Sequence, residues 1–340
     1  MGDYNSMYND NLYKKKYHDN DISSSSFLIT GGAGFIGSNI VEYLLKNNAG
    51  KVRVLDNLSN GYFDNIKNFI SLSNFEFIEG DIRNLELCKT AIEGMDFVSH
   101  QAALGSVPRS IADPITTNDV NISGFLNILN AAKESKKLKR FIYAASSSTY
   151  GDSSELPKIE GREGKILSPY AVTKAVNEMY ADVFSKVNNF HSIGLRYFNV
   201  FGPKQNPNNP YAAVIPLFCK NFILNQRSTI FGDGLTSRDF TFVENVVQAN
   251  IKALLFEELN NHEVFNVACG DQTSLNEIIN YLNKLNNKNL NPIYEESRKG
   301  DIRHSRASID KICNVLNYNP EFNFEQGLKI VFDWYQNQYL

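Results

Sequence analysis

The feature that most constrains this chain is a glycine-rich run that directly follows a short apolar segment. Residues 27–30 are apolar up to a final threonine, and residues 31–37 read Gly-Gly-Ala-Gly-Phe-Ile-Gly. A continuous apolar segment of this length predicts a strand buried on both faces. Gly31, Gly34 and Gly37 then predict a tight turn that leads directly into a helix.

Short apolar runs of the same kind recur through the first part of the chain. They lie at residues 52–56, 75–79, 97–100, 141–145 and 193–197, with helical periodicity at 38–46, 124–133 and 170–187. Alternating strands and helices predict a parallel sheet with right-handed crossovers and helices on both faces. The predicted fold class is therefore α/β, with a Rossmann-type doubly wound parallel sheet.

The glycine turn and the end of the second strand together predict a site for NAD. Glycines let the backbone approach a diphosphate closely, and the following helix offers its free N–H groups to the phosphates. Asp56 places a carboxylate about 20 residues past the glycines, where it can accept hydrogen bonds from a ribose and repel a 2′-phosphate. NAD is therefore favoured over NADP. A purely steric glycine turn is the alternative, and Asp56 argues against it.

The other residues expected around NAD follow the ends of the predicted strands. Ligands of such folds bind at the carboxyl edge of the sheet, where these ends meet. The residues concerned are Asn57, Asn60 and Gly61 after the second strand, Asp81 and Ile82 after the third, and Gln101, Ala102 and Ala103 after the fourth.

A serine, a tyrosine and a lysine form the predicted catalytic group. Ser146 ends the fifth strand, while Tyr170 and Lys174 lie four residues apart, on one face of the next helix. A phenol titrates near ~10, so it is a poor base at neutral pH. We expect the Lys174 ammonium and the nicotinamide ring of NAD to lower the pKa of Tyr170, which can then accept a proton from a substrate hydroxyl. Tyr-x-x-x-Lys alone would be an accidental surface pair, but it follows the other motifs in the expected order.

Together these motifs resemble the extended short-chain dehydrogenase/reductase superfamily, and in particular its NAD-dependent epimerase/dehydratase family. The resemblance covers residues 27–340, and the stretches 101–110, 146–150 and 195–202 are similar to those of bacterial UDP-N-acetylglucosamine 4-epimerases. It implies a homodimeric enzyme that inverts the 4-hydroxyl of UDP-N-acetylglucosamine, or of its uronic acid, through a 4-keto intermediate. It also implies a role in supplying surface polysaccharide precursors.

The resemblance also assigns residues that spacing alone does not. It adds Phe35, Ile36, Asn121 and Val200 to the NAD site, next to Tyr170 and Lys174. It places Asn199, Arg238, Arg298 and Asp301 against the nucleotide sugar, with the arginines on the diphosphate and Asp301 on the ribose. Gly105, Ser148, Ala213 and Ser305 leave room for an N-acetyl group, and Ser106, Ser146, Ser147 and Val214 complete the predicted substrate site.

Prolines mark a change of character after residue 199, where Pro203, Pro207, Pro210 and Pro216 crowd a loop-rich stretch. We therefore divide the sequence into an N-terminal extension (1–26), an NAD-binding Rossmann domain (27–200) and a smaller C-terminal substrate-binding lobe (201–340). Strands are predicted at 239–243 and 264–268, and one or both are candidates to rejoin the first sheet. Residues 1–21 are either a packed helix or a disordered tail, with the serine run at 23–26 as a linker.

Two other functions stay open at this point. A sugar-nucleotide 4,6-dehydratase needs a carboxylic acid and a carboxylate beside Ser146, where this chain has Ser147 and Ser148. A catalytically silent NAD-binding regulator is the second alternative, because such folds also bind dinucleotides without turnover. The intact group of Ser146, Tyr170 and Lys174 argues against it.

Composition argues against several other classes of protein. The net charge of −3, from 34 basic and 37 acidic residues, does not favour nucleic acid as a partner. Cys88, Cys219, Cys269 and Cys313 are scattered without metal-ligand spacing, so we expect reduced thiols and no metal. No apolar run approaches the roughly 20 residues that span a bilayer, and the first residues lack the apolar stretch of a signal peptide. We expect a cytoplasmic protein.

Overall fold

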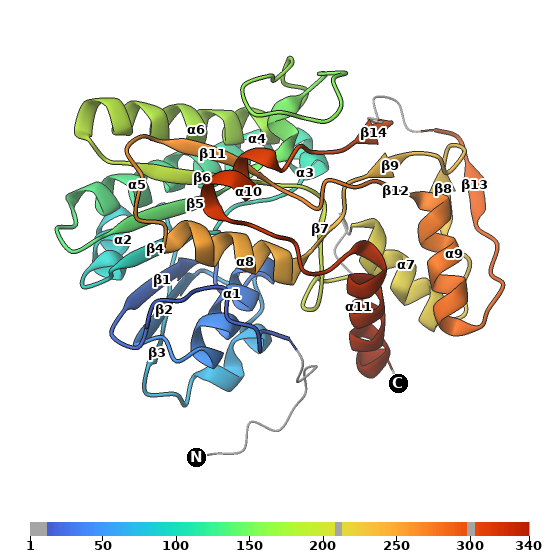
Figure 1. The fold of residues 1–340 in the computed structure, drawn as a ribbon, viewed down its shortest axis with the longest axis horizontal. Helices are drawn as coiled ribbons and strands as arrows, with labels where there is room; N and C mark the ends of the chain where they lie inside the picture. Colours follow the sequence, from blue (N-terminus) through green and yellow to red (C-terminus); the bar gives the residue numbers. More distant parts are fainter. Residues whose placement is uncertain (1–11, 208–212, 298–302, 340) are drawn as a thin grey trace.

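A seven-stranded parallel sheet forms the centre of the part of the chain that the structure, a computed structural model, describes: residues 12–207, 213–297 and 303–339 (Figure 1). The strand order is β11-β6-β5-β4-β1-β2-β3. The strands are β1 (Ser26–Thr30), β2 (Lys51–Asp56), β3 (Phe75–Glu79), β4 (Phe97–His100), β5 (Arg140–Ser146), β6 (Ser192–Tyr197) and β11 (Glu263–Val267). The order reverses direction beside β1, which is the doubly wound arrangement that the sequence predicts.

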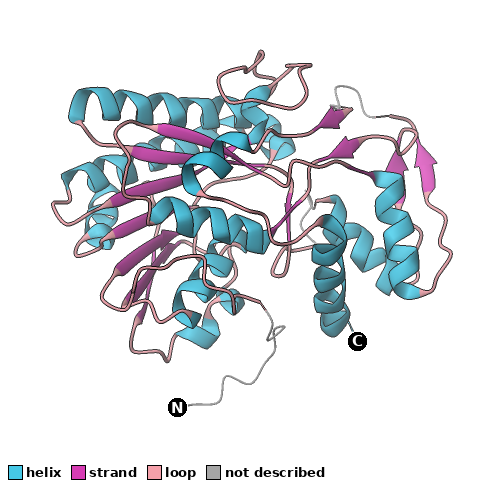
Figure 2. Cartoon of the chain, in the orientation of Figure 1, coloured by secondary structure: helices cyan, strands magenta, loops and turns pink. Residues whose placement is uncertain are grey.

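Helices cover both faces of this sheet, as Figure 2 shows. They are α1 (Phe35–Lys46), α2 (Leu85–Ile92), α5 (Phe125–Glu134), α6 (Pro169–Asn188) and α8 (Val243–Leu254), and the short helices α3 (Val107–Ala112) and α4 (Pro114–Asn118) pack beside α6. Successive side chains of β1 explain the two covered faces: Phe27 and Ile29 belong to the core shared with α1 and α8, whereas Leu28 belongs to the core shared with α2, α5 and α6. Both faces of the strand are apolar, so both need a helical cover.

The remaining elements build a smaller lobe to one side of the sheet (Figure 1). Its helices are α7 (Val214–Ile223), α9 (Leu275–Asn286) and α11 (Phe324–Tyr339), and α10 (Asp310–Leu316) packs against β11. Its short strands are β7 (Val200–Phe201), β8 (Thr229–Phe231), β9 (Ser237–Arg238), β10 (Thr241–Phe242), β12 (Thr273–Ser274), β13 (Ile293–Glu295) and β14 (His304–Ser305). β14 and β12 flank β9, and β10 pairs with β7.

The two strands predicted in the second half of the chain have different outcomes. Residues 263–267 rejoin the main sheet as β11, parallel to β6. The strand predicted over 239–243 is present but shorter, as β10 (Thr241–Phe242), and it pairs with β7 rather than with the main sheet. Asp239 lies outside this strand: its buried carboxylate accepts hydrogen bonds from the backbone N–H groups of Cys269, Gly270 and Ala307. These three hydrogen bonds hold the Asp239 side chain in the core, and the backbone turns there between β9 and β10.

The N-terminal extension also differs from both predicted alternatives. Residues 12–22 form no helix, yet Leu12, Tyr13, Tyr17 and Ile22 are all buried in the core that α1 and α8 share. The chain then enters β1 at Ser26, which is buried rather than part of an exposed linker. Predictions for residues 1–11 lie outside the described residues.

The described residues hold neither a membrane-spanning helix nor a metal-binding cluster. No described helix is long and apolar enough to cross a bilayer. No group of three or more His, Cys, Asp and Glu side chains in the described ranges is placed to hold a metal ion. The four cysteines are free thiols.

Candidate active site

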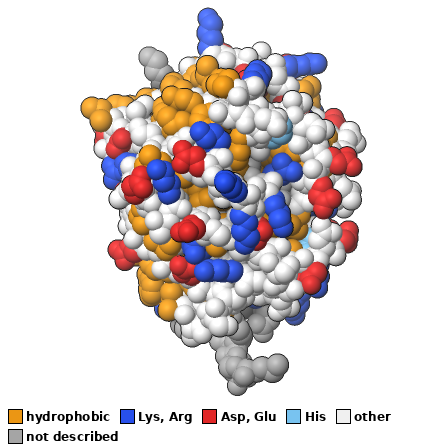
Figure 3. All heavy atoms as spheres, turned by 90° about the vertical axis from the view of Figure 1, so that its left-hand side faces the viewer, with side chains coloured by type: hydrophobic (Ala, Val, Ile, Leu, Met, Phe, Trp, Pro, Cys, Tyr) orange, Lys and Arg blue, Asp and Glu red, His pale blue; other side chains and the backbone are white. Residues whose placement is uncertain are grey.

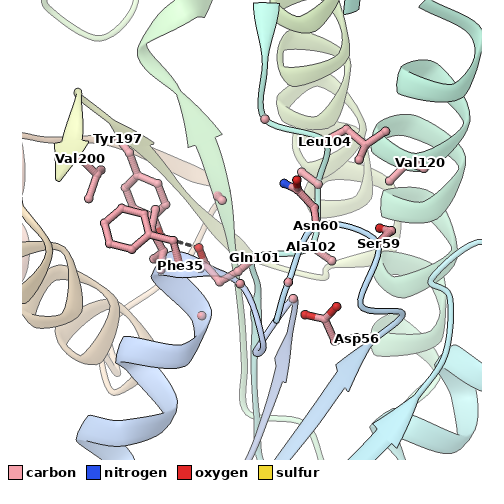
Figure 4. Close-up of a pocket in the computed structure, with 18 of the residues that line it drawn as sticks. Phe35, Asp56, Ser59, Asn60, Gln101, Ala102, Leu104, Val120, Tyr197 and Val200 are labelled. Carbon is pink, nitrogen blue, oxygen red and sulfur yellow. Dashed lines mark hydrogen bonds between the residues drawn. The ribbon is translucent and has the colours of Figure 1, made fainter. Parts of the chain in front are cut away.

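A cleft of about 500 Å³ opens along the carboxyl edge of the main sheet (Figure 4). The ends of β1, β2, β4 and β5 reach it from the sheet, and the first turns of α1 and α6 reach it from the helices. Most residues predicted for NAD line it: Gly31, Gly34, Phe35, Ile36, Gly37, Asp56, Asn57, Asn60, Gly61, Asp81, Ile82, Gln101, Ala102, Ala103, Tyr170, Lys174 and Val200. Of the predicted substrate residues, Gly105, Ser146, Ser147, Asn199 and Ala213 also line it.

The glycine turn brings backbone, rather than side chains, to one wall of the cleft. Gly31 has φ +66°, and a Cβ there would lie 2.6 Å from the backbone nitrogen of Ala102. A Cβ on Gly37 would lie 2.2 Å from the carbonyl oxygen of Gly31, so helix α1 can pack this close only without a side chain. Both positions require glycine for steric reasons.

The start of α1 has the chemistry of an anion site. Its N-cap is Gly34, which offers no side chain to the first N–H groups, and the first turn carries no acidic residue. Gly34 lines the cleft, and apart from the Gly31 carbonyl oxygen at 3.1 Å no atom lies within 4 Å of where its Cβ would stand. Free N–H groups and the positive end of the helix dipole therefore face open space, which fits a diphosphate.

Asp56 closes the end of β2 beside this turn. One carboxylate oxygen accepts a hydrogen bond from the Ala33 N–H at 2.9 Å and the other from the Leu58 N–H at 2.9 Å. Burial raises the pKa of Asp56, while these backbone hydrogen bonds act in the opposite direction. The carboxylate thus stabilises the glycine turn and also borders the cleft, where it is placed to accept hydrogen bonds from a ribose.

A second carboxylate, Asp81, lies across from Asp56 at the end of β3. It accepts hydrogen bonds from Asn57 Nδ2 at 2.8 Å and from the Arg83 guanidinium at 2.7 Å. The Arg83 hydrogen bond is the main reason that the pKa of Asp81 is lowered to about 2. Asp81 therefore stays ionised at neutral pH and holds the loops after β2 and β3 together.

The three predicted catalytic residues meet at the other end of the cleft. Ser146 ends β5, and its hydroxyl lies close enough to the Tyr170 phenol to act on the pKa of that phenol. Lys174 Nζ lies 6.0 Å from the centre of the Tyr170 ring and donates a hydrogen bond to the Ala144 carbonyl oxygen at 2.7 Å. The start of α6 is fixed by the Ser168 side chain, which accepts from the Ala171 N–H, and by Ser110 Oγ, which accepts from the Tyr170 N–H at 3.0 Å.

The expected effect of Lys174 on Tyr170 needs a correction. Burial raises the pKa of Tyr170, and only Ser146 acts to lower it. Lys174 is itself 4% exposed, and burial lowers its pKa to about 8. Because a buried ammonium is costly and here donates to a carbonyl oxygen, the lysine alone does not lower the pKa of the phenol.

Several predicted residues do not line the cleft. Asn121 is buried behind it, where its amide bonds both backbone groups of Leu104. Ser106 caps α3, and Ser148 donates a hydrogen bond to Ser146 Oγ at 2.9 Å. The others are Val214 at the start of α7, Arg238 on β9 and Ser305 on β14, the last two paired in register. Arg298 and Asp301 lie outside the described residues.

Other lining residues were not predicted from the sequence. They are Leu55, Ser59, Tyr62, Gly80, Leu104, Val120, Ala144, Ala145, Tyr197, Lys204, Gln205 and Asn206. Leu55, Gly80, Ala144 and Ala145 lie just before predicted residues at strand ends. The rule that ligands bind at the carboxyl ends of parallel strands therefore applies to these four residues as well. Lys204, Gln205 and Asn206 follow β7 in an irregular loop, and no pattern in the sequence marks them.

A buried hydrogen-bond network supports the floor of the cleft. The Tyr197 hydroxyl donates to Gln101 Oε1 at 3.1 Å, the contact dashed in Figure 4, and accepts from Asn250 Nδ2 at 2.9 Å. Gln101 Nε2 donates in turn to Asn250 Oδ1 at 3.0 Å. The network joins β4, β6 and α8, so it fixes the positions of Gln101 and Tyr197 in the wall of the cleft.

This fold and site define a dinucleotide-binding protein with a Ser-Tyr-Lys group facing the dinucleotide cleft. The chain belongs to the NAD dependent epimerase/dehydratase family, whose model matches residues 27–268. NAD is therefore its cofactor, and the free N–H groups at the start of α1 and the Asp56 carboxylate fit that cofactor.

Similar proteins carry the names of UDP-sugar 4-epimerases. A putative UDP-glucose 4-epimerase of Methanocaldococcus jannaschii is 35% identical over 312 residues, 91% of this chain and 98% of that one. The structure of UDP-N-acetylglucosamine 4-epimerase from Methanobrevibacter ruminantium, in complex with UDP-N-acetylmuramic acid, is 36% identical with a TM-score of 0.86, covering 92% of this chain and 99% of that one. UDP-glucuronic acid 4-epimerase from Bacillus cereus, in complex with UDP-glucuronic acid and NAD, is 32% identical with a TM-score of 0.85, covering 92% and 100%.

Proposed function

We propose that this protein is an NAD-dependent 4-epimerase that interconverts UDP-N-acetylglucosamine and UDP-N-acetylgalactosamine, or the corresponding uronic acids, through a 4-keto intermediate. One observation carries the proposal: Ser146, Tyr170 and Lys174 converge at one end of a cleft whose other end has the features of a dinucleotide site. The similarity to UDP-sugar 4-epimerases supports it.

Each catalytic residue has a separate task in this proposal. Bound NAD supplies a hydride acceptor that also returns the hydride. Tyr170 accepts the proton of the sugar 4-hydroxyl and later returns it, with Ser146 hydrogen-bonded to the same oxygen. Lys174 orients the end of β5 through Ala144 and adds positive charge near the phenol. Because Lys174 alone does not lower the pKa of Tyr170, the phenol would need the positive charge of bound NAD beside it to act as a base near neutral pH.

The sugar end of the cleft has the room that an N-acetyl group needs. Gly105 and Ala213 line it, and no atom lies within 4 Å of where a Cβ on Gly105 would stand. Inversion at carbon 4 also requires the keto sugar to turn over, which small side chains permit. We propose that Arg238 and Ser305 reach the nucleotide sugar from the smaller lobe, together with Arg298 and Asp301.

The distribution of carboxylates favours an epimerase over a 4,6-dehydratase. Among the described residues that line the cleft, the carboxylates are Asp56 and Asp81, both at the end where β2 and β3 finish. Ser147 and Ser148 follow Ser146, and their hydroxyls cannot serve as an acid and base pair at neutral pH. Among the described lining residues, the elimination of water that a dehydratase performs therefore finds no carboxyl group beside Tyr170.

Proton NMR of the purified protein with UDP-N-acetylglucosamine tests the proposal. We expect the signal of an equatorial hydrogen at carbon 4 to appear as the 4-hydroxyl becomes axial, with no other change in the sugar. A 4-keto-6-deoxy product would identify a dehydratase, and an unchanged spectrum would indicate a regulator without turnover. Parallel reactions with UDP-glucose and UDP-glucuronic acid rank the substrates, and a clear preference for UDP-glucose would overturn the assignment to N-acetylated sugars.

A further inference from the structure

The N-terminal segment 12–22 precedes the region matched by the family model, yet it is tightly packed on α8 and on α1, whose first turn lines the NAD cleft. The Tyr17 N–H donates to the hydroxyl of Tyr43 on α1 at 2.7 Å, and the Tyr13 N–H donates to Glu244 Oε1 on α8 at 3.2 Å. The Tyr17 hydroxyl donates to the same Glu244 oxygen at 2.9 Å. The segment therefore ties α1 to α8.

One contact of this segment leads toward the cleft. The Tyr13 hydroxyl donates to Oδ1 of Asn39, a residue of α1 that is 1% exposed. Asn39 Nδ2 donates at once to the carbonyl oxygen of Phe35 at 2.8 Å and to that of Pro203 at 3.2 Å. The Asn39 amide nitrogen donates to two carbonyl oxygens. The Tyr13 hydroxyl, which donates to the amide oxygen, therefore fixes the orientation of the whole amide group. Tyr13 thus holds Asn39 between the first turn of α1 and the loop that contains Pro203.

The loop 203–206 crosses from the β7 side of the cleft to its opposite wall. Lys204 Nζ is buried and donates to Glu42 Oε2 on α1 at 2.8 Å, which fixes the loop a second time. Lys204, Gln205 and Asn206 line the cleft. Asn206 Nδ2 donates to the hydroxyl of Tyr62, which lines the cleft from the loop after β2.

We propose that Tyr13 is a positioning residue for cofactor retention: through Asn39 it holds loop 203–206 across the cleft and slows the release of NAD. Release then requires the loop to leave both Tyr62 and its Asn39 contact on α1. The inference concerns the cofactor and is independent of the sugar substrate. It gives a task to a segment that lies outside the family match.

Exchange of bound NAD for isotopically labelled NAD, measured on the purified holoenzyme without sugar, tests this inference. Tyr13→Phe removes one hydroxyl and keeps the ring packing, and Asn39→Ala removes the amide itself. We expect NAD to exchange about three- to tenfold faster in either variant, the effect of one lost hydrogen bond on a rate. The double variant should exchange no faster than Asn39→Ala alone, because Tyr13 acts through Asn39.

Tyr17→Phe is the matched control. It removes a hydroxyl from the same segment, but one that contacts Glu244 rather than Asn39. We expect it to lower the melting temperature much as Tyr13→Phe does and to leave NAD exchange at the parental rate. Parental exchange in Tyr13→Phe would overturn the inference, and so would equally fast exchange in Tyr17→Phe, since both would reduce the segment to a stabilising role. The exchange rates of Tyr13→Phe and Tyr17→Phe are measured without sugar, so they do not depend on which sugar the enzyme prefers. Failure of this inference is therefore distinguishable from failure of the proposed function.

Discussion

Tyr170 is the residue on which the proposed chemistry depends. Its ring is partly buried in the cleft wall, so Tyr170→Phe keeps the packing and removes only the group that exchanges a proton. We expect NAD content to stay at the parental level and kcat to fall by about 100-fold or more, the usual contribution of a general base. NMR-monitored turnover and the absorbance of released NAD measure the two quantities. Tyr143→Phe is the control, because its hydroxyl faces His262 away from the cleft, 3.3 Å distant. Activity retained in Tyr170→Phe would remove this residue from the role of base.

Lys174 makes the stability of the protein depend on pH in a defined direction. Burial lowers its pKa from 10.5 to about 8 in the folded protein, whereas the unfolded chain keeps the ordinary value. Between these values the unfolded state binds more protons, so stability increases as the pH rises from about 8 to about 10. We expect the free energy of unfolding, relative to Lys174→Met, to increase by on the order of 2 kcal/mol across this window. Urea denaturation of the parent protein and of Lys174→Met at several pH values measures this difference in the free energy of unfolding. The tyrosines are the same in both proteins, so their titration does not contribute to the difference. A constant difference would show that Lys174 is not buried as an ammonium.

The sequence predicted the residues that strand ends and helix spacing determine, and missed those that tertiary contacts determine. Asp56, Gln101 and Tyr170 follow from where strands end and helices begin, since those points meet at one sheet edge. Lys204 lines the cleft, and its amine is fixed by Glu42 and by the Ser38 carbonyl oxygen, both far away in the sequence. No local pattern encodes such a pair.

The element that presents Tyr170 is stabilised at its first turn. Ser168 is the N-cap of α6, its side chain accepts from the Ala171 N–H, and Pro169 follows at the first helical position. We expect Ser168→Ala to lower the free energy of unfolding by about 1 kcal/mol. It should also lower kcat several-fold, because Tyr170 lies in the turn that frays. Denaturation curves and turnover numbers check the two effects.

Ser274→Ala is the matched control for this helix. Ser274 caps α9 in the smaller lobe, in a capping box with Glu277. We expect a similar loss of stability there with kcat unchanged. Equal losses of turnover in the two variants would mean that capping of α6 has no specific role in placing Tyr170.

At the scale of elements, the apolar pattern predicted the strands of the main sheet. It did not predict the segments whose structure depends on hydrogen bonds of polar side chains. The strand predicted over 239–243 begins only at Thr241, after Asp239, whose carboxylate accepts hydrogen bonds from three backbone N–H groups. The prediction for the N-terminal extension missed the structure of residues 12–22 for a related reason. Tyr13 and Tyr17 carry no helical or strand periodicity, and their burial depends on partners on α1 and α8. Long-range hydrogen bonds decided both segments.

At the scale of the whole molecule, one helix leaves an apolar face without a partner in the described chain. Val172, Met179, Val183 and Val187 lie on one side of α6, spaced by seven, four and four residues, and are 45%, 66%, 50% and 75% exposed. Ile111 and Ile115, 64% and 81% exposed, extend this face from α3 and α4, which pack beside α6. Figure 3 looks toward the end of the molecule where α6 finishes, and hydrophobic side chains gather near its top. A contiguous exposed apolar face of this kind is typical of a protein interface.

We expect this α6 face to form a homodimer, in which the same helix packs against its symmetry mate. Met179→Glu and Val183→Glu would each bury a charge in that contact and should convert the dimer to a monomer in sedimentation velocity experiments. Leu235→Glu, at a 53% exposed leucine of the smaller lobe, is the control that should stay dimeric. The monomeric variants should also have lower turnover, because α6 carries Tyr170 and is held less firmly when the dimer contact is lost. A parent protein that sediments as a monomer would exclude the dimer, and dimers that persist in both glutamate variants would place the contact on another face.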